Sequence, residues 1–138
     1  MVQRVARKML RWWLDRALGR GYGAFIGKGA RIAKDVKFVH ELYGVFIAGE
    51  AVIEEGCHIF QHVTIGAKKG PDDRYQAPRI GRNVVIGANA TLLGRCVIGS
   101  GAKIGAGVTV VDAVIPDGAI VVNKSAYDLT NQRFIYEQ

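Results

Sequence analysis

The sequence predicts an all-β protein: one parallel β-helix, preceded by a short amphipathic α-helix. Two features carry this prediction: aliphatic residues recur at every sixth position, and a glycine often follows the aliphatic residue. Residues two apart on a strand share a face, so each aliphatic residue and the small or β-branched residue two positions earlier point inward together. The remaining residues of each repeat form a turn, where glycine tolerates unusual backbone angles.

The six-residue period runs through most of the chain, whereas an α-helix would need apolar spacing near 3.6 residues. Its positions are Ile26, Ile32, Phe38, Ile47, Ile53, Ile59, Ile65, Ile80, Ile86, Leu92, Ile98, Ile104 and Val110. Three short strands are expected to close one triangular coil, and successive coils to stack about 4.8 Å apart. Residues 18 apart should therefore stack, which pairs Ile86 with Ile104 and Ile80 with Ile98.

The chain divides into three segments. Residues 1–21 are predicted to form a basic amphipathic helix, residues 22–123 the β-helix with an inserted loop at 67–79, and residues 124–138 a tail that covers the C-terminal end. The helix either caps the open end of the coil and hides its strand edges, or contacts a membrane surface. Its paired tryptophans and its arginines suit a peripheral anchor through residues 3–20.

Composition sets the broad class. The 138 residues are 49% hydrophobic and 22% charged, which indicates one globular domain. No apolar run is long enough to span a membrane and no signal peptide is evident, so we expect a cytoplasmic protein, with the inner membrane face as the alternative. The net charge of +7 suits an anionic ligand. Nucleic-acid binding is not expected, because no aromatic-basic face accompanies the charge.

The two cysteines, Cys57 and Cys96, occupy inward positions on different faces of the coil. We expect both to be core residues rather than a disulfide, metal ligands or a nucleophile. No metal is expected at all. A β-helix zinc site needs three converging histidines, whereas His58 and His62 point in different directions and no histidine follows them.

Two segments break the period. The step from Phe38 to Ile47 is nine residues and the step from Ile65 to Ile80 is fifteen, where six are expected. Insertions in a repeat array tend to lie on its functional edge. The longer one, AKKGPDDRYQAPR, is charged and aromatic.

A histidine lies in the shorter insertion. His40 is two residues past Phe38 in the six-residue count, and Gln61 is two residues past Ile59, with His62 beside it. We therefore expect these three residues at the same corner of adjacent coils, near the root of the long loop.

The segment FVHELYGVFIAGEAVIEEGCHIFQHVTIG, the loop and the following APRIGRNVVIGANATLLGRCVIGSGAKIGAGVTVV resemble the serine acetyltransferase group of hexapeptide acyltransferases, over about residues 22–122. The resemblance implies a left-handed coil, acetyl-CoA as co-substrate, and a homotrimer with active sites between subunits. It also implies transfer of acetyl to a hydroxyl group of a small molecule or a saccharide.

The resemblance also assigns residues. His40 matches the histidine that acts as general base on the acceptor hydroxyl, a role that suits a neutral imidazole. Arg74, between Asp73 and Tyr75, matches the arginine that pairs with the substrate carboxylate. With His62 and Gln61, these three loop residues form the predicted substrate-binding set.

The expected acetyl-CoA contacts lie on two parts of the coil. Ala88 and Ala106 match positions whose backbone lines the CoA groove, and they are 18 residues apart, as a groove along the coil axis requires. Gly66 and Ala67 resemble the start of the family's loop beside the pantetheine arm.

The chain departs from the family where an aspartate should orient the histidine, because Phe25 stands there. Asp35, Glu41 and Glu50 are the acids that could replace it, and the sequence does not rank them. The large helical N-terminal domain of serine enzymes is also missing, which makes a sugar hydroxyl a credible acceptor. The alternative to an enzyme is a non-catalytic β-helix that serves as a scaffold or assembly protein.

Overall fold

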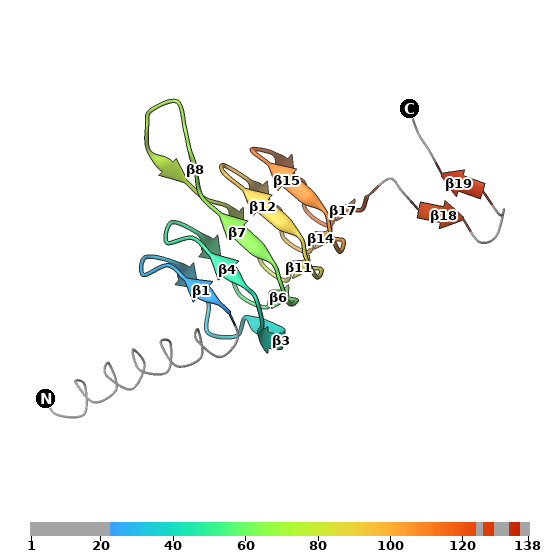
Figure 1. Cartoon of the computed structure of the whole chain (residues 1–138), viewed down its shortest axis with the longest axis horizontal. Coiled ribbons are helices and arrows are strands. Elements are labelled where there is room, and N and C mark those ends of the chain that lie inside the picture. Colours follow the sequence, from blue (N-terminus) through green and yellow to red (C-terminus); the bar gives the residue numbers. More distant parts are fainter. Residues whose placement is uncertain (1–22, 124–125, 129–132, 136–138) are drawn as a thin grey trace, which may run out of the picture.

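The computed structural model describes residues 23–123, 126–128 and 133–135 (Figure 1). Within this part, the chain winds into a triangular prism whose sides are three five-stranded parallel sheets. The predicted N-terminal helix over residues 1–21 lies outside the described residues.

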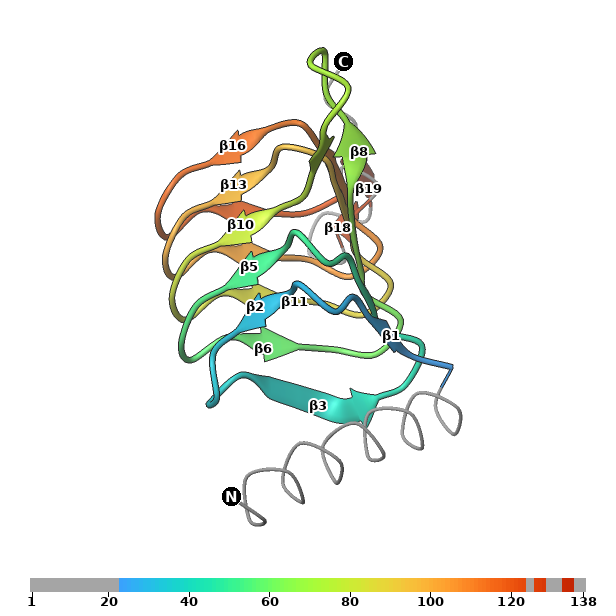
Figure 2. The same ribbon diagram turned by 90° about the vertical axis from the view of Figure 1, so that its left-hand side faces the viewer.

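Each coil contributes one short strand to each side of the prism, here named faces A, B and C. Face A contains β1 (Phe25–Ile26), β4 (Phe46–Ile47), β7 (Thr64–Gly66), β12 (Thr91–Leu93) and β15 (Thr109–Val111). Face B contains β2 (Arg31–Ile32), β5 (Val52–Ile53), β10 (Arg79–Ile80), β13 (Val97–Ile98) and β16 (Val114–Ile115). Face C contains β3 (Lys37–Leu42), β6 (His58–Ile59), β11 (Val85–Ile86), β14 (Lys103–Ile104) and β17 (Ile120–Val121). The helix is left-handed, and Figure 2 shows its coils stacked one above the other, from β2 through β5, β10 and β13 to β16.

The predicted stacking of the aliphatic residues is confirmed. Ile86 pairs with Ile104 on one side and with Ile59 on the other, all on face C. On face B, Ile80 pairs in the same way with Ile98 and Ile53. These side chains are at most 2% exposed, and among the described residues every buried core side chain is aliphatic or a cysteine. Removal of this surface from water is the main favourable contribution to folding.

Both cysteines lie inside the prism, as predicted. Cys57 is fully buried and Cys96 is 1% exposed, and both thiols are free. Cys57 precedes a face C strand and Cys96 a face B strand, so they belong to different faces. The Cys57 Sγ lies 3.0 Å from the Gly81 carbonyl oxygen, and burial raises the pKa of this thiol.

The prism has three corners, where the chain turns from one face to the next. The histidine corner, between faces C and A, comprises residues 40–44, 60–62, 87–89 and 105–107. The loop corner, between faces A and B, comprises residues 48–50, 66–78, 94–96 and 112–113. The acidic corner, between faces B and C, comprises residues 33–36, 54–56, 81–83, 99–101 and 116–118.

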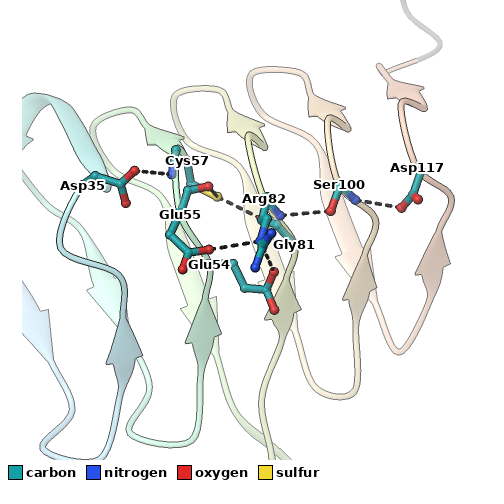
Figure 3. Close-up of polar contacts among 9 residues, drawn as sticks. Asp35, Glu54, Glu55, Cys57, Gly81, Arg82, Ser100 and Asp117 are labelled. Carbon is teal, nitrogen blue, oxygen red and sulfur yellow. Dashed lines mark hydrogen bonds and ion pairs between the residues drawn. The ribbon is translucent and has the colours of Figure 1, made fainter.

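A line of polar contacts runs along the acidic corner and ties successive coils together (Figure 3). Asp35 Oδ2 accepts a hydrogen bond from the Gly56 N–H at 3.0 Å. Further along, Ser100 Oγ accepts from the Arg82 N–H at 3.1 Å, and Asp117 Oδ1 accepts from the Ser100 N–H at 2.8 Å. Side chains thus satisfy backbone donors that the turns leave unpaired.

Two hairpins interrupt the parallel pattern. Strands β8 (Lys68–Lys69) and β9 (Tyr75–Gln76) pair antiparallel within the long loop, and β18 (Ala126–Asp128) pairs antiparallel with β19 (Arg133–Ile135) in the C-terminal tail. The capping role expected of residues 124–138 stays a prediction. Within the described ranges, no helix is long and apolar enough to cross a membrane.

The core makes a direct prediction about stability. Replacing Ile104, which is 2% exposed, with alanine should lower the free energy of unfolding by about 2–5 kcal/mol, because it leaves a cavity in the prism. The exposed neighbour provides the control, since Lys103→Ala should stay within about 0.5 kcal/mol of the parent. Urea unfolding measures both, and equal losses would contradict the assigned inward and outward positions.

Candidate functional site

His40 lies on β3, and its exposed side chain faces the next coil. Its ring meets that of Phe60 edge-on, with centroids 5.8 Å apart. Phe60 immediately precedes Gln61 and His62, so the structure brings the three polar residues expected together to the same corner.

The second histidine of this corner stacks on a different part of the insertion. The His62 N–H donates to the Tyr43 carbonyl oxygen at 2.8 Å, and the His62 and Tyr43 rings meet edge-on at 5.9 Å. Its imidazole also lies against Gly44, which has a φ of 63° and where a Cβ would collide with Nδ1. The extra residues of the insertion therefore extend β3 to Leu42. The turn that contacts His62 is formed by Tyr43 and Gly44.

The predicted CoA positions lie along the same corner. The Asn89 N–H donates to the Gln61 carbonyl oxygen at 3.1 Å, and the Gly107 N–H donates to the Ala88 carbonyl oxygen at 2.8 Å. Gln61, Ala88 and Ala106 thus occupy successive coils along the axis of the prism. Ala88 is half-buried and Ala106 is exposed, so their backbone borders the surface.

The structure separates the three acids that could orient His40. Asp35 lies at the acidic corner, where it caps the Gly56 N–H, and Glu50 lies at the loop corner. Glu41, next to His40 in sequence and exposed, is the one that shares its corner. Phe25, at the place of the family's aspartate, stacks on Phe46 with ring centroids 4.9 Å apart.

The long loop does not leave from the histidine corner, so the expectation that its root lies near His40 is wrong within one chain. The loop follows β7 on face A and leads into β10 on face B, so it projects from the loop corner (Figure 2). The two corners lie at opposite ends of the face A strands, so the length of one strand separates them. Successive six-residue repeats turn the chain at successive corners. Residues 61–64 lead from the histidine corner onto face A, so the loop that follows Gly66 begins one corner later.

The predicted substrate-binding residues of the loop extend into solvent. The Arg74 side chain is 86% exposed, and its Nε lies 3.9 Å from an Asp72 carboxylate oxygen. Lys69 Nζ pairs with Asp73 Oδ1 at 2.7 Å and lies 5.8 Å from the centre of the Tyr75 ring. At the loop's start, Gly66 is buried and Ala67 is half-buried.

A charged contact that the sequence did not predict holds the root of the loop. Lys68 Nζ lies 2.5 Å from Asp112 Oδ2, and the Arg95 N–H donates to Asp112 Oδ1 at 2.9 Å. The Lys68 hydrogen bond, followed by that of Arg95, lowers the pKa of the Asp112 carboxyl. The sequence held one signal of this contact, which is that Gly94 and Asp112 are 18 residues apart and so stack on adjacent coils. In the structure a Cβ on Gly94 would collide with the Asp112 carboxylate.

The hollows beside the long loop lie away from His40. Two hollows of about 430 and 410 Å³ flank the β8–β9 hairpin, and His40 lines neither. Within the ranges that the structure describes, no three histidine, cysteine or acidic side chains group as a metal site would require.

Comparison with known proteins identifies similar chains. Residues 77–112 match the bacterial transferase hexapeptide family (six repeats). Serine acetyltransferase of Salmonella typhimurium is 36% identical over 111 residues, which are 80% of this chain and 40% of the relative. The serine acetyltransferase of Synechococcus elongatus is 36% identical over 99 residues, which are 72% and 40% of the two chains.

Solved structures show the same similarity. Serine acetyltransferase of Neisseria gonorrhoeae in complex with serine has a TM-score of 0.70 at 35% identity, covering 88% of this chain and 48% of that one. A serine acetyltransferase in complex with CoA has a TM-score of 0.67 at 31% identity, covering 86% and 47%. The chain spans about 40% of the length of the curated relatives it matches.

The contact between His62 and Gly44 can be measured. Gly44→Ala should destabilise the protein more than Gly118→Ala, because both glycines have positive φ but only the first also meets a side chain. The backbone cost common to both is about 1–2 kcal/mol, and the collision at Gly44 should add about 1–3 kcal/mol. Thermal or urea unfolding measures the difference. The added cost should vanish in a background of His62→Ala; equal losses in the two glycine variants would exclude the contact.

The charged contact at the loop root predicts a pH dependence. Since the folded-state pKa of Asp112 is lowered, the stabilisation from its ionised form is present above the ordinary aspartate pKa and is lost as the pH falls through the lowered value. A carboxyl ¹³C titration by NMR should place the pKa below the ordinary value, and Lys68→Gln should raise it. Lys69→Gln is the matched control, because Lys69 pairs with Asp73 instead. An Asp112 titration that Lys68→Gln leaves unmoved would contradict the assignment.

Proposed function

The chain belongs to the serine acetyltransferase-like group of hexapeptide-repeat acyltransferases, and on this basis we propose that it is an acetyl-CoA-dependent O-acetyltransferase. One observation carries the proposal beyond family membership. His40, Gln61, Ala88 and Ala106, assigned from the sequence to two different tasks, line up along a single corner of the prism. A base and a groove for the acetyl donor must adjoin for direct transfer to occur.

The chemistry needs few groups. The neutral imidazole of His40 accepts the proton of the acceptor hydroxyl while the oxygen attacks the thioester carbonyl of acetyl-CoA. The new C–O bond forms, the C–S bond breaks, and the CoA thiolate leaves with a proton returned to it from His40. No covalent enzyme intermediate is required. Backbone N–H groups would stabilise the oxyanion that develops on the carbonyl oxygen.

An oligomer of this chain would bring the long loop of one subunit close to the His40 of another. We assign the active site to the interface between neighbouring subunits of a homotrimer, where the loop of one subunit reaches the histidine corner of the next. The position of the two corners on opposite edges of face A supports this arrangement. The exposed guanidinium of Arg74 is then available to a carboxylate on the acceptor, with Asp73 and Tyr75 beside it.

We propose serine as the acceptor. The relatives are serine acetyltransferases, and one of the similar structures holds serine. An arginine in the loop suits the carboxylate of an amino acid, which a plain sugar lacks. Other small hydroxyl compounds and saccharides are the comparison acceptors in the assay.

The proposed base gives the first test of the function. His40→Ala should lower the rate of CoA thiol release with acetyl-CoA and serine by about 10²–10⁴-fold, the usual value of a general base. His58→Ala is the matched control, because His58 lies mid-face on β6 away from the corner, and it should retain the parent rate. If the rate of the His40 variant equals that of the parent, the base lies elsewhere.

The donor site can be tested without knowing the acceptor. CoA at about 100 times its Kd should raise the free energy of unfolding by about 2.7 kcal/mol, measured as a shift in Tm. The shift should persist in His40→Ala, since the base is not needed for donor binding. A chain whose Tm does not respond to millimolar CoA would instead be a non-catalytic scaffold.

A further inference from the structure

We propose that the loop corner carries a second binding site, which takes a small anion with a carboxylate or phosphate group between Arg79 and Arg95. The site shares only Tyr75 with the residues assigned to substrate binding. It stands on its own observations, whether or not the chain is a transferase.

The register of the coils creates the site. Arg79 on β10 pairs with Val52 on the coil before and with Val97 on the coil after. Two residues earlier on the same three coils lie Glu50, Ala77 and Arg95. The small side chain of Ala77 therefore lies between two long charged ones, whose backbones are about 10 Å apart at two strand spacings.

The gap above Ala77 is the larger of the two hollows beside the hairpin. It has a volume of about 430 Å³ and is lined by Glu50, Tyr75, Gln76, Ala77, Arg79 and Arg95, among others. Coils form its floor, and the end of the hairpin at strand β9 forms one wall. A hollow of a few hundred Å³ with a few convergent polar groups is the usual form of a small-molecule site.

Charge selects the ligand. Some cations of the described surface pair with acids: Lys68 with Asp112, Lys69 with Asp73, and Arg82 with Glu54 and Glu55. Others, such as Arg31 and Lys103, form no ion pair with a described residue. Neither Arg79 nor Arg95 has an ion-pair partner among the described residues, although the carboxylate of Glu50 lines the same hollow.

Two guanidinium groups without partners at one hollow favour an anion. Their planar forks match the geometry of carboxylate and phosphate oxygens. Arg95 also lines the second hollow, of about 410 Å³, where Lys68 and Lys69 are paired with Asp112 and Asp73. Glu50, at the other end of the slot, should repel an anion that carries no positive group.

The test uses the full chain with inorganic phosphate and malonate as probes, followed by ¹⁵N NMR at constant ionic strength. Saturable shifts should appear at the amides of Gln76, Ala77 and Val97. Arg95→Gln and Arg79→Gln should each weaken binding by about tenfold or more, the usual value of a charge-assisted hydrogen bond. Glu50→Gln should tighten it by about twofold to threefold, because a like charge is removed.

Arg31→Gln is the matched control. Arg31 lies on β2 of the same face, two coils from Arg79 and outside the hollow, and its loss should change the affinity less than about twofold. His40→Ala should leave phosphate binding unchanged, which separates this proposal from the function of the histidine corner. Retained melting temperature in each variant shows that a loss of affinity is not a loss of fold.

The two probes divide the outcomes. Binding of phosphate alone, malonate alone or both supports the site and defines which anion it prefers. Absence of saturable shifts for either probe up to about 50 mM, a level at which even a weak site would be filled, overturns the proposal. Equal weakening by Arg31→Gln and Arg95→Gln also overturns it, because binding would then follow net charge alone.

Discussion

Everything in this molecule depends on the burial of one aliphatic side chain in every six residues. Each such residue must reach the interior of the prism, so each repeat turns the chain through one corner and each third repeat returns it to the same face. Parallel hydrogen bonds then hold residues 18 apart side by side over long stretches. A residue's place on the surface follows from its position within the six-residue repeat, because any shift of that repeat would turn the core side chains outward.

Insertions act on this frame without breaking it. The shorter one lengthens β3, so the chain re-enters the count at Ile47 in register with Ile65. The longer one leaves the prism as a hairpin, and Ile80 still pairs with Ile53. Both insertions are at corners, where an added residue costs no core contact. The histidine and the loop therefore vary independently of the fold that carries them.

The three corners differ in what satisfies their turns. The acidic corner uses carboxylates and a serine hydroxyl to cap backbone N–H groups, which ties coil to coil. At the histidine corner, backbone carbonyl oxygens accept the hydrogen bonds of the turn N–H groups. The imidazole of His40 is therefore not needed to cap a turn. The loop corner anchors the hairpin through Lys68 and Asp112 and leaves two arginines beside a hollow. The acidic corner thus stabilises the stack of coils, whereas the other two corners expose the side chains proposed to bind or react with ligands.

The sequence alone determined the prism, its core and the register, because a period of six allows one inward phase, and it placed both cysteines and the pair Ala88 and Ala106 correctly. It also brought His40, Gln61 and His62 to one corner. Only the tertiary structure decided that the loop leaves from a different corner, that Asp35 and Glu50 lie at other corners than His40, and that Asp112 holds the loop root. Those facts depend on the path of the inserted residues and on side-chain contacts across coils, and neither follows from the spacing of aliphatic residues.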